Sequence, residues 1–177
     1  MTNTWFTSDT HFGHANIIRL CKRPHKDVTE MDEDLIEKWN SVVKSGDTVY
    51  HLGDFAFRGN DDKTTEIFNR LNGNKILIKG NHDDNHTTRN LKWQAVHQYL
   101  EIKGFSGLDR LVLFHYPMRE WNGWYRGAVH LYGHCHDTLP LKNNSCDVGV
   151  DAWGFRPVNY DEIVAVLEQN PTTERPF

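Results

Sequence analysis

The 177-residue sequence predicts an α/β domain with an antiparallel portion in its second half. The first observation is that short apolar runs of strand length alternate with segments of helical periodicity in the first half. The second is that apolar runs follow one another in the second half, which favours antiparallel pairing. No repeat or low-complexity linker divides the chain. We therefore expect one domain over residues 1–177, with a frayed polar tail at 170–177.

Strands and helices are predicted in turn along the first half. One long helix begins with Thr29 as its N-cap, and Gly46 ends it. Met31, Leu35 and Trp39 recur at helical spacing along it, so they belong to the core. The predicted strands cover residues 4–8, 48–52 and 75–79, and the other predicted helices cover residues 15–20 and 63–71.

The second half is richer in strands and closes with a helix. Asn159 and Glu162 form a capping-box pattern at the start of this helix. Ile163, Val166 and Leu167 then give it an apolar face. The predicted strands cover residues 98–102, 111–114, 129–132 and 146–150.

Composition and charge exclude several classes of protein. A formal net charge of −4 and a pI near 6.2 provide no basic footprint for duplex nucleic acid. No apolar run approaches the roughly 18 residues of a membrane span, and the first residues lack the layout of a secretory signal. The three cysteines are widely spaced, which argues against a disulfide scaffold and favours a cytoplasmic protein. Eleven histidines stand out, because histidine is the commonest metal ligand.

Metal-binding types of side chain gather where the predicted strands end. In open α/β sheets, ligands bind at this edge. Asp9 and His11 are two positions apart, as are His134 and His136, so each pair projects to one side of an extended segment. The sequence therefore predicts one site, formed by Asp9, His11, Asp54, Asn81, His82, His115, His134 and His136.

The donor atoms of this predicted site suit two metal ions. Carboxylate, imidazole and amide oxygen ligands favour Mn, Fe, Zn, Co or Ni over copper(I) or an iron–sulfur cluster. Seven such donors exceed the three or four protein ligands of one catalytic ion, but they suffice for two ions if one carboxylate bridges. Two ions about 3.5–4 Å apart form the clamp that phosphatases and nucleases use.

Five short blocks carry these residues in order along residues 9–136: Asp9-Thr10-His11, Gly53-Asp54, Gly80-Asn81-His82-Asp83, His115 and Gly133-His134-Cys135-His136. With them the sequence resembles the calcineurin-like metallophosphoesterases, whose pattern is D-x-H, G-D, G-N-H-[DE], a single H and G-H-x-H. The neighbouring residues are similar to those of small stand-alone bacterial and phage-type members. The resemblance implies two mixed β-sheets packed as a sandwich and flanked by helices, in four αββα layers.

The resemblance also implies a role for each block. One divalent ion would be held by Asp9, His11, Asp54 and His136. The second would be held by Asp54, Asn81, His115 and His134, with Asp54 bridging the two. A hydroxide between the ions would attack phosphorus, while His82 assists the leaving oxygen and Asp83 orients His82 or its loop. Manganese is the ion that we expect first, with Fe, Zn, Ni, Co or Mg as alternatives.

Several other residues have a functional and a structural interpretation. His14 either contacts the substrate phosphate or caps the helix at 15–20. Arg58 and Arg126 either pair with the phosphate or are solvated surface residues. Three aromatic residues lie between His115 and the following strand: Trp121, Trp124 and Tyr125. They either stack on a base of the substrate or pack into the core, and we favour the core.

The function expected from the sequence is metal-dependent hydrolysis of a phosphoester, with a diester favoured over a monoester. Alternatives are a phosphomonoesterase or nuclease at the same site, and a non-catalytic metal-binding or protein-binding scaffold. Scaffold-type relatives lack a ligand or the catalytic histidine, whereas His82 and all seven ligands are present here. We expect a small or nucleotide-derived substrate and no membrane partner. The sequence predicts no oligomeric state.

Overall fold

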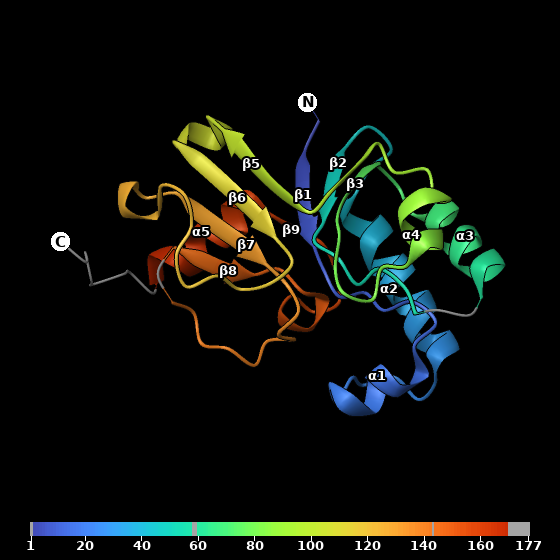
Figure 1. Cartoon of the computed structure of the whole chain (residues 1–177). Helices are drawn as coiled ribbons and strands as arrows, with labels where there is room; N and C mark the ends of the chain where they lie inside the picture. Colours follow the sequence, from blue (N-terminus) through green and yellow to red (C-terminus); the bar gives the residue numbers. More distant parts are fainter. Residues whose placement is uncertain (1, 58–59, 143, 170–177) are drawn as a thin grey trace.

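Two β-sheets form the centre of the protein (Figure 1). The computed structural model describes residues 2–57, 60–142 and 144–169. In the larger sheet the strand order is β4-β3-β2-β1-β9, in which β1 to β4 are parallel and β9 is antiparallel to β1. Its strands are β1 (Thr4–Thr7), β2 (Thr48–His51), β3 (Asn74–Ile78), β4 (Ala95–His97) and β9 (Val158–Asn159).

The smaller sheet has the order β5-β6-β7-β8. Only β5 and β6 are antiparallel, whereas β6, β7 and β8 are parallel to one another. The antiparallel portion expected in the second half is thus the β5–β6 pair, whereas a crossover through the 3₁₀ helix η2 (Trp124–Arg126) joins the parallel strands β6 and β7. The four strands are β5 (Tyr99–Lys103), β6 (Arg110–Phe114), β7 (Val129–Tyr132) and β8 (Ser145–Asp147).

The helix starts follow local hydrogen bonding. The carboxylate of Asp27 accepts a hydrogen bond from Glu30 N at 2.9 Å and caps α2, so the predicted N-cap at Thr29 is wrong. At the start of α5, Asn159 Oδ1 accepts a hydrogen bond from Glu162 N at 3.0 Å, as predicted. The helices are α1 (Ala15–Leu20), α2 (Val28–Val42), α3 (Asp61–Arg70), α4 (Asn85–Arg89) and α5 (Tyr160–Gln169), with 3₁₀ helices η1 (Phe105–Gly107) and η3 (Val150–Ala152).

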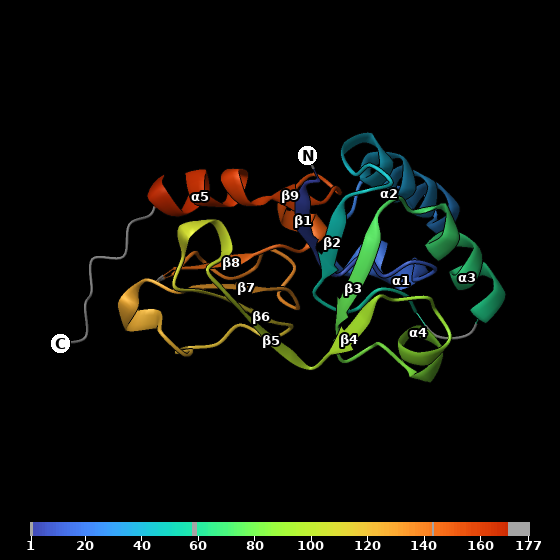
Figure 2. The same cartoon turned by 90° about the horizontal axis from the view of Figure 1, so that it is seen from above.

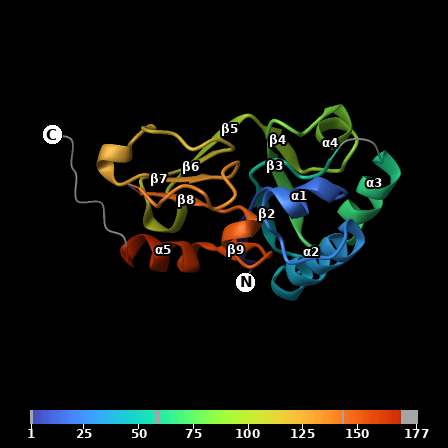
Figure 3. The same cartoon turned by 90° about the horizontal axis from the view of Figure 1, so that it is seen from below.

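Apolar clusters separate the layers. Helices α1 to α4 lie on the side of the larger sheet that faces away from the smaller one (Figures 2 and 3), and Leu35 of α2 packs there with Trp5 of β1. Phe6 points to the other face, where it packs with Leu111 of the smaller sheet and with residues of α5. The outer face of the smaller sheet is covered by the segment around η2, with Trp121 buried against it.

These layers confirm the predicted fold class, two mixed sheets flanked by helices. The sheets meet near the end of β1, where Ser8 forms an isolated parallel bridge with Gly149, which follows β8. The loops that end β1, β2, β3, β6 and β7 carry the five sequence blocks. Among the described helices, none has the length and apolar character that crossing a bilayer requires.

Candidate metal centre

The loops that follow β1 and β2 run side by side. Asp9 N donates to Gly53 O, and His11 N donates to Asp54 O, both at 3.0 Å. Asp9, His11 and Asp54 have positive φ angles of 56°, 50° and 57°. Residues other than glycine rarely adopt this region, and they keep it only where the surroundings enforce it. The paired loops therefore hold three predicted ligands in fixed turns beyond the strand ends.

Glycines let the remaining loops approach these turns. A Cβ on Gly53, where φ is +96°, would lie 2.5 Å from the backbone nitrogen of Gly80. A Cβ on Gly80 would overlap the Asp54 carboxylate, and one on Gly133 would overlap the Asp9 carboxylate. The glycines of three blocks are thus explained by close approach of backbone and carboxylates at the site.

The first group of potential metal ligands is Asp9, His11 and His136. One ligand atom from each lies within 4.8 Å of the others. Asp9 Oδ1 and His11 Nε2 are 4.0 Å apart, buried, and without a hydrogen-bond partner in the described chain. Buried polar atoms are costly when they lack a partner, and a cation between these two would satisfy both. The residues present therefore fit a divalent metal ion.

The second group is Asp54, His115 and His134. Asn81 joins it, because its Oδ1 atom lies 3.0 Å from His115 Nε2 and 3.0 Å from His134 Nδ1. Imidazole nitrogens, a carboxylate and an amide oxygen thus converge on one point, a donor set suited to a borderline divalent ion.

Asp54 lies between the two groups. Its Oδ2 atom is 3.6 Å from His11 Nε2 and 3.6 Å from His115 Nε2. Its other oxygen, Oδ1, accepts a hydrogen bond from His82 N at 2.8 Å. One carboxylate oxygen therefore faces both groups at equal distance, in the position that a bridging ligand requires.

Further hydrogen bonds orient the ligands. His115 Nδ1 donates to Leu52 O at 2.7 Å, which leaves Nε2 free to face the site. His136 Nδ1 pairs with Asp151 Oδ2 at 2.7 Å. The backbone nitrogen of His134 donates to Asp9 Oδ2 at 2.9 Å, which leaves Asp9 Oδ1 for a metal. Such bonds fix the tautomer and the ring orientation of a metal-binding histidine.

Arg23 and Asp151 support this arrangement, and the sequence analysis missed both. The Arg23 side chain is 0% exposed and forms a two-pronged ion pair with Asp151, with Nε–Oδ1 and Nη2–Oδ2 distances of 2.8 Å. Arg23 also donates to the carbonyl oxygens of Asp9 and Thr10, at 2.7 and 3.0 Å. No block or spacing marks these residues, because the contact joins positions 128 apart.

Burial and charge shift the pKa values of the first group. Burial raises the pKa of Asp9 to about 8 and lowers the pKa of His11 far below its usual range. Burial alone would lower the pKa of His136, but its hydrogen bonds to Asp151 and Cys21 and the charge of Asp9 raise it to about 10. A cation would favour the charged form of Asp9, whose ionisation burial now opposes.

The loop after β3 carries the predicted catalytic pair. The His82 ring centroid lies 5.3 Å from that of His11, at the side of the first group. Asp83 is buried, and its carboxylate accepts hydrogen bonds from the backbone nitrogens of Asp54, Phe55 and Gly80 at 2.8–2.9 Å. Asp83 thus ties the loop of His82 to the loop of Asp54.

His14 also borders the site. It is 8% exposed, and its Nδ1 lies 3.4 Å from His11 Nδ1. Its ring stacks on Phe57 with centroids 4.1 Å apart. It occupies the N-cap position of α1 without a side-chain capping bond, so capping does not explain its orientation.

The remaining predicted residues lie elsewhere. Arg58 lies outside the described residues, as does the tail at 170–177. Arg126 stands on η2, where it stacks on Tyr125 at 4.8 Å and lies 3.8 Å from Asp109, so the structure does not bring it to the metal-ligand groups. Trp121 is buried in the cluster on the outer face of the smaller sheet and Trp124 packs against it, as the core interpretation predicts. Tyr125 is 62% exposed, so the core interpretation is wrong for this residue.

Comparison with known proteins agrees with this geometry. The family model for the calcineurin-like phosphoesterases matches residues 2–153. An uncharacterized protein of Methanocaldococcus jannaschii is 35% identical over 96% of this chain and 93% of its own. The gene 66 protein of Mycobacterium phage L5 is 31% identical over 92% of this chain and 93% of its own. The crystal structure of a protein of unknown function from Aquifex aeolicus has a TM-score of 0.75 and 26% identity, covering 94% of this chain and 100% of its own.

Proposed function

Because the chain belongs to the calcineurin-like phosphoesterase family, we propose that it hydrolyses phosphodiesters at a centre of two divalent metal ions. The observation that carries the proposal is the position of Asp54, whose Oδ2 atom lies 3.6 Å from a histidine nitrogen of each ligand group. A shared carboxylate between two sets of imidazoles is what a pair of ions would need.

The two ions would be held by the residues that converge in the structure. Asp9, His11 and His136 would hold the first, Asn81, His115 and His134 the second, and Asp54 both. When bound, the ions supply positive charge to the phosphoryl oxygens and make water more acidic. Manganese is the ion that we propose first, because carboxylate and amide oxygens are present beside the imidazoles.

His82 would act on the leaving group. Its backbone is anchored by the bond from His82 N to Asp54 Oδ1, and its loop is tied down by Asp83. The side chain is half-buried and belongs to neither ligand group, so its ring nitrogens are available to a substrate. We propose that the ring donates a proton to the departing oxygen of the phosphoester.

A hollow beside the centre offers room for an organic group of the substrate. It measures 540 Å³ and includes Asn81 and Gly80 in its lining, so it adjoins the second ligand group. A hollow of this size can hold one organic group of a phosphoester.

We also propose a cytoplasmic location. The three cysteines form no disulfide, which is consistent with this location.

A panel of substrates tests the proposed function. Metal-stripped protein should hydrolyse no phosphoester, and added Mn²⁺ should restore hydrolysis of a phosphodiester before Mg²⁺ does. If the protein hydrolyses phosphomonoesters faster than phosphodiesters, the proposed preference for diesters is wrong and the protein is a phosphomonoesterase. Activity that persists after thorough chelation would overturn the metal-dependent mechanism. Two bound ions with no hydrolysis of any substrate would favour a scaffold.

A further inference from the structure

The hollow beside the second ligand group is lined by polar and aromatic residues. Its wall includes Asn81, whose Oδ1 atom lies 3.0 Å from both His115 Nε2 and His134 Nδ1. The hollow therefore adjoins the candidate metal centre. The lining residues are Lys79, Gly80, Asn81, Asp83, Asp84, Asn85, Gln98, Phe114 and Tyr116.

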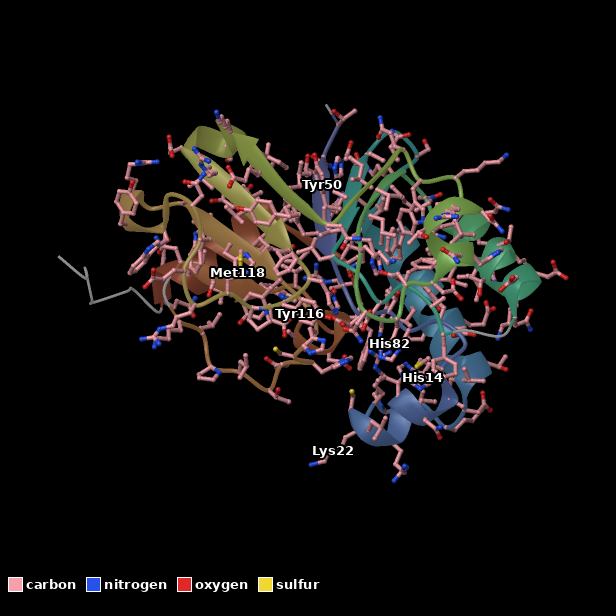
Figure 4. The ribbon with its side chains drawn as sticks, in the orientation of Figure 1. His14, Lys22, Tyr50, His82, Tyr116 and Met118 are labelled. Atoms are coloured by element: carbon pink, nitrogen blue, oxygen red, sulfur yellow. The ribbon has the colours of Figure 1, made fainter. Side chains whose placement is uncertain are left out.

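Aromatic rings form one side of this hollow. Phe114 and Tyr116 have ring centroids 5.6 Å apart, and the Tyr116 ring lies 4.7 Å from that of His134. Tyr116 is 38% exposed although it adjoins a metal-ligand candidate. Figure 4 labels it between Met118 and His82, in the region where the two sheets meet. An exposed ring at this place offers a flat surface on which another ring can stack.

Polar side chains face the same space without partners. The side chains of Lys79, Asn85 and Gln98 make no hydrogen bond in the described chain. Each amide offers both donors and an acceptor, as the edge of a nucleobase does. The two acidic residues of the lining are already engaged, since Asp83 accepts three backbone hydrogen bonds and Asp84 accepts one from Thr87 N at 3.0 Å.

We propose that this hollow holds the nucleoside of a nucleotide-derived phosphodiester. The base stacks on the exposed ring of Tyr116, the amides of Asn85 and Gln98 bind its edge, and the phosphorus lies at the metal centre. The chemistry at phosphorus rests on the proposed function, whereas recognition of the nucleoside rests on the hollow. The hollow is within the range of 300–1,000 Å³ that small-molecule sites occupy.

Binding of a product-like pair tests the inference. With Mn²⁺ present, isothermal titration should show that adenosine 5′-monophosphate binds at least about tenfold more tightly than ribose 5-phosphate, which lacks the base. Tyr116→Leu, which keeps apolar bulk beside His134, should remove most of this difference. Tyr125→Leu is the matched control, because Tyr125 is 62% exposed on η2 and does not line the hollow.

The outcomes separate this inference from the proposed function. Equal affinity for the two ligands in the wild-type protein would overturn the inference, whatever the protein hydrolyses. An equal loss of preference in the Tyr116 and Tyr125 variants would also overturn it. Preference for the nucleotide together with no hydrolysis of bis(p-nitrophenyl) phosphate would support the hollow and contradict the proposed function.

Discussion

Replacing Asp151 by alanine should destabilise the protein and weaken its metal binding together. The change removes both oxygens that pair with the buried Arg23 guanidinium, at 2.8 Å each, and the acceptor that lies 2.7 Å from His136 Nδ1. Arg23 keeps only its bonds to two carbonyl oxygens and to the sulfur of Met31. A full positive charge would then stay buried without a counter-charge.

The size of the effect follows from this burial. Breaking one partner of a buried ion pair costs about 3–5 kcal/mol, because the remaining charge loses its compensation. Removing the partner of a metal-binding imidazole lowers metal affinity by about 10- to 100-fold. Asp151→Asn retains one acceptor oxygen, so it should lie between the wild type and the alanine variant on both scales. If the alanine variant does not fold, the asparagine variant carries the test.

Urea unfolding of metal-stripped protein, followed by circular dichroism, measures the first effect, and titration with Mn²⁺ measures the second. Glu33→Ala is the matched control, since Glu33 forms a similar two-pronged pair with Arg70 at 2.7 and 2.5 Å. Those side chains are 55% and 38% exposed, so their loss should cost about 1 kcal/mol or less. Equal losses in the Asp151 and Glu33 variants, with unchanged metal affinity, would refute the reasoning.

Three further predictions concern other parts of the site and core. His82→Asn should retain both metal ions but lose most turnover on diesters with poor leaving groups, and loss of a metal from this variant would contradict the assignment of His82 as a proton donor. Asp83→Ala should lower the free energy of unfolding in urea by at least about 3 kcal/mol, because three backbone N–H groups lose their acceptor. Asp84→Ala removes only a helix cap and should lower it by about 1 kcal/mol. Equal losses in the two variants would contradict the role of Asp83 in tying the loop of His82 to the loop of Asp54. Burial lowers the pKa of His130 to about 4, below its unfolded value, so its contribution to stability is complete above about pH 6.5 and falls by about 2 kcal/mol as the pH drops to about 5. In His130→Gln this part of the pH dependence should disappear, and an unchanged profile would contradict it.

Much of the fold could be predicted from local patterns. The strands were placed from apolar runs, and β7 covers the predicted residues 129–132. The short elements β4, α4 and β9 were missed, since none is long enough for its periodicity to stand out. Both Thr29 and Asp27 are residue types that favour the N-cap position. Only the hydrogen bond from Glu30 N to the Asp27 carboxylate shows which of them caps the helix.

The candidate metal ligands were predicted from residue types at strand ends. The residues that hold these ligands in place were not predicted. Asp54 and His115 follow separate strands, and parallel packing brings their ends together. Arg23 and Asp151 meet only because η3 packs under the loop after β1, a tertiary contact without a sequence pattern. The sequence analysis weighed a stacking role for Trp121, Trp124 and Tyr125 and favoured the core, but it did not single out Tyr116, the exposed ring beside His134.

Electron paramagnetic resonance of the Mn²⁺-loaded protein tests the central claim most directly, that two ions share Asp54. Metal-stripped protein would be titrated with Mn²⁺ while the bound metal per chain is counted by elemental analysis. The account predicts two ions per chain with the spectrum of an exchange-coupled pair, and loss of that coupling in Asp54→Ala. One ion per chain, or two ions with the spectrum of isolated Mn²⁺, would contradict it.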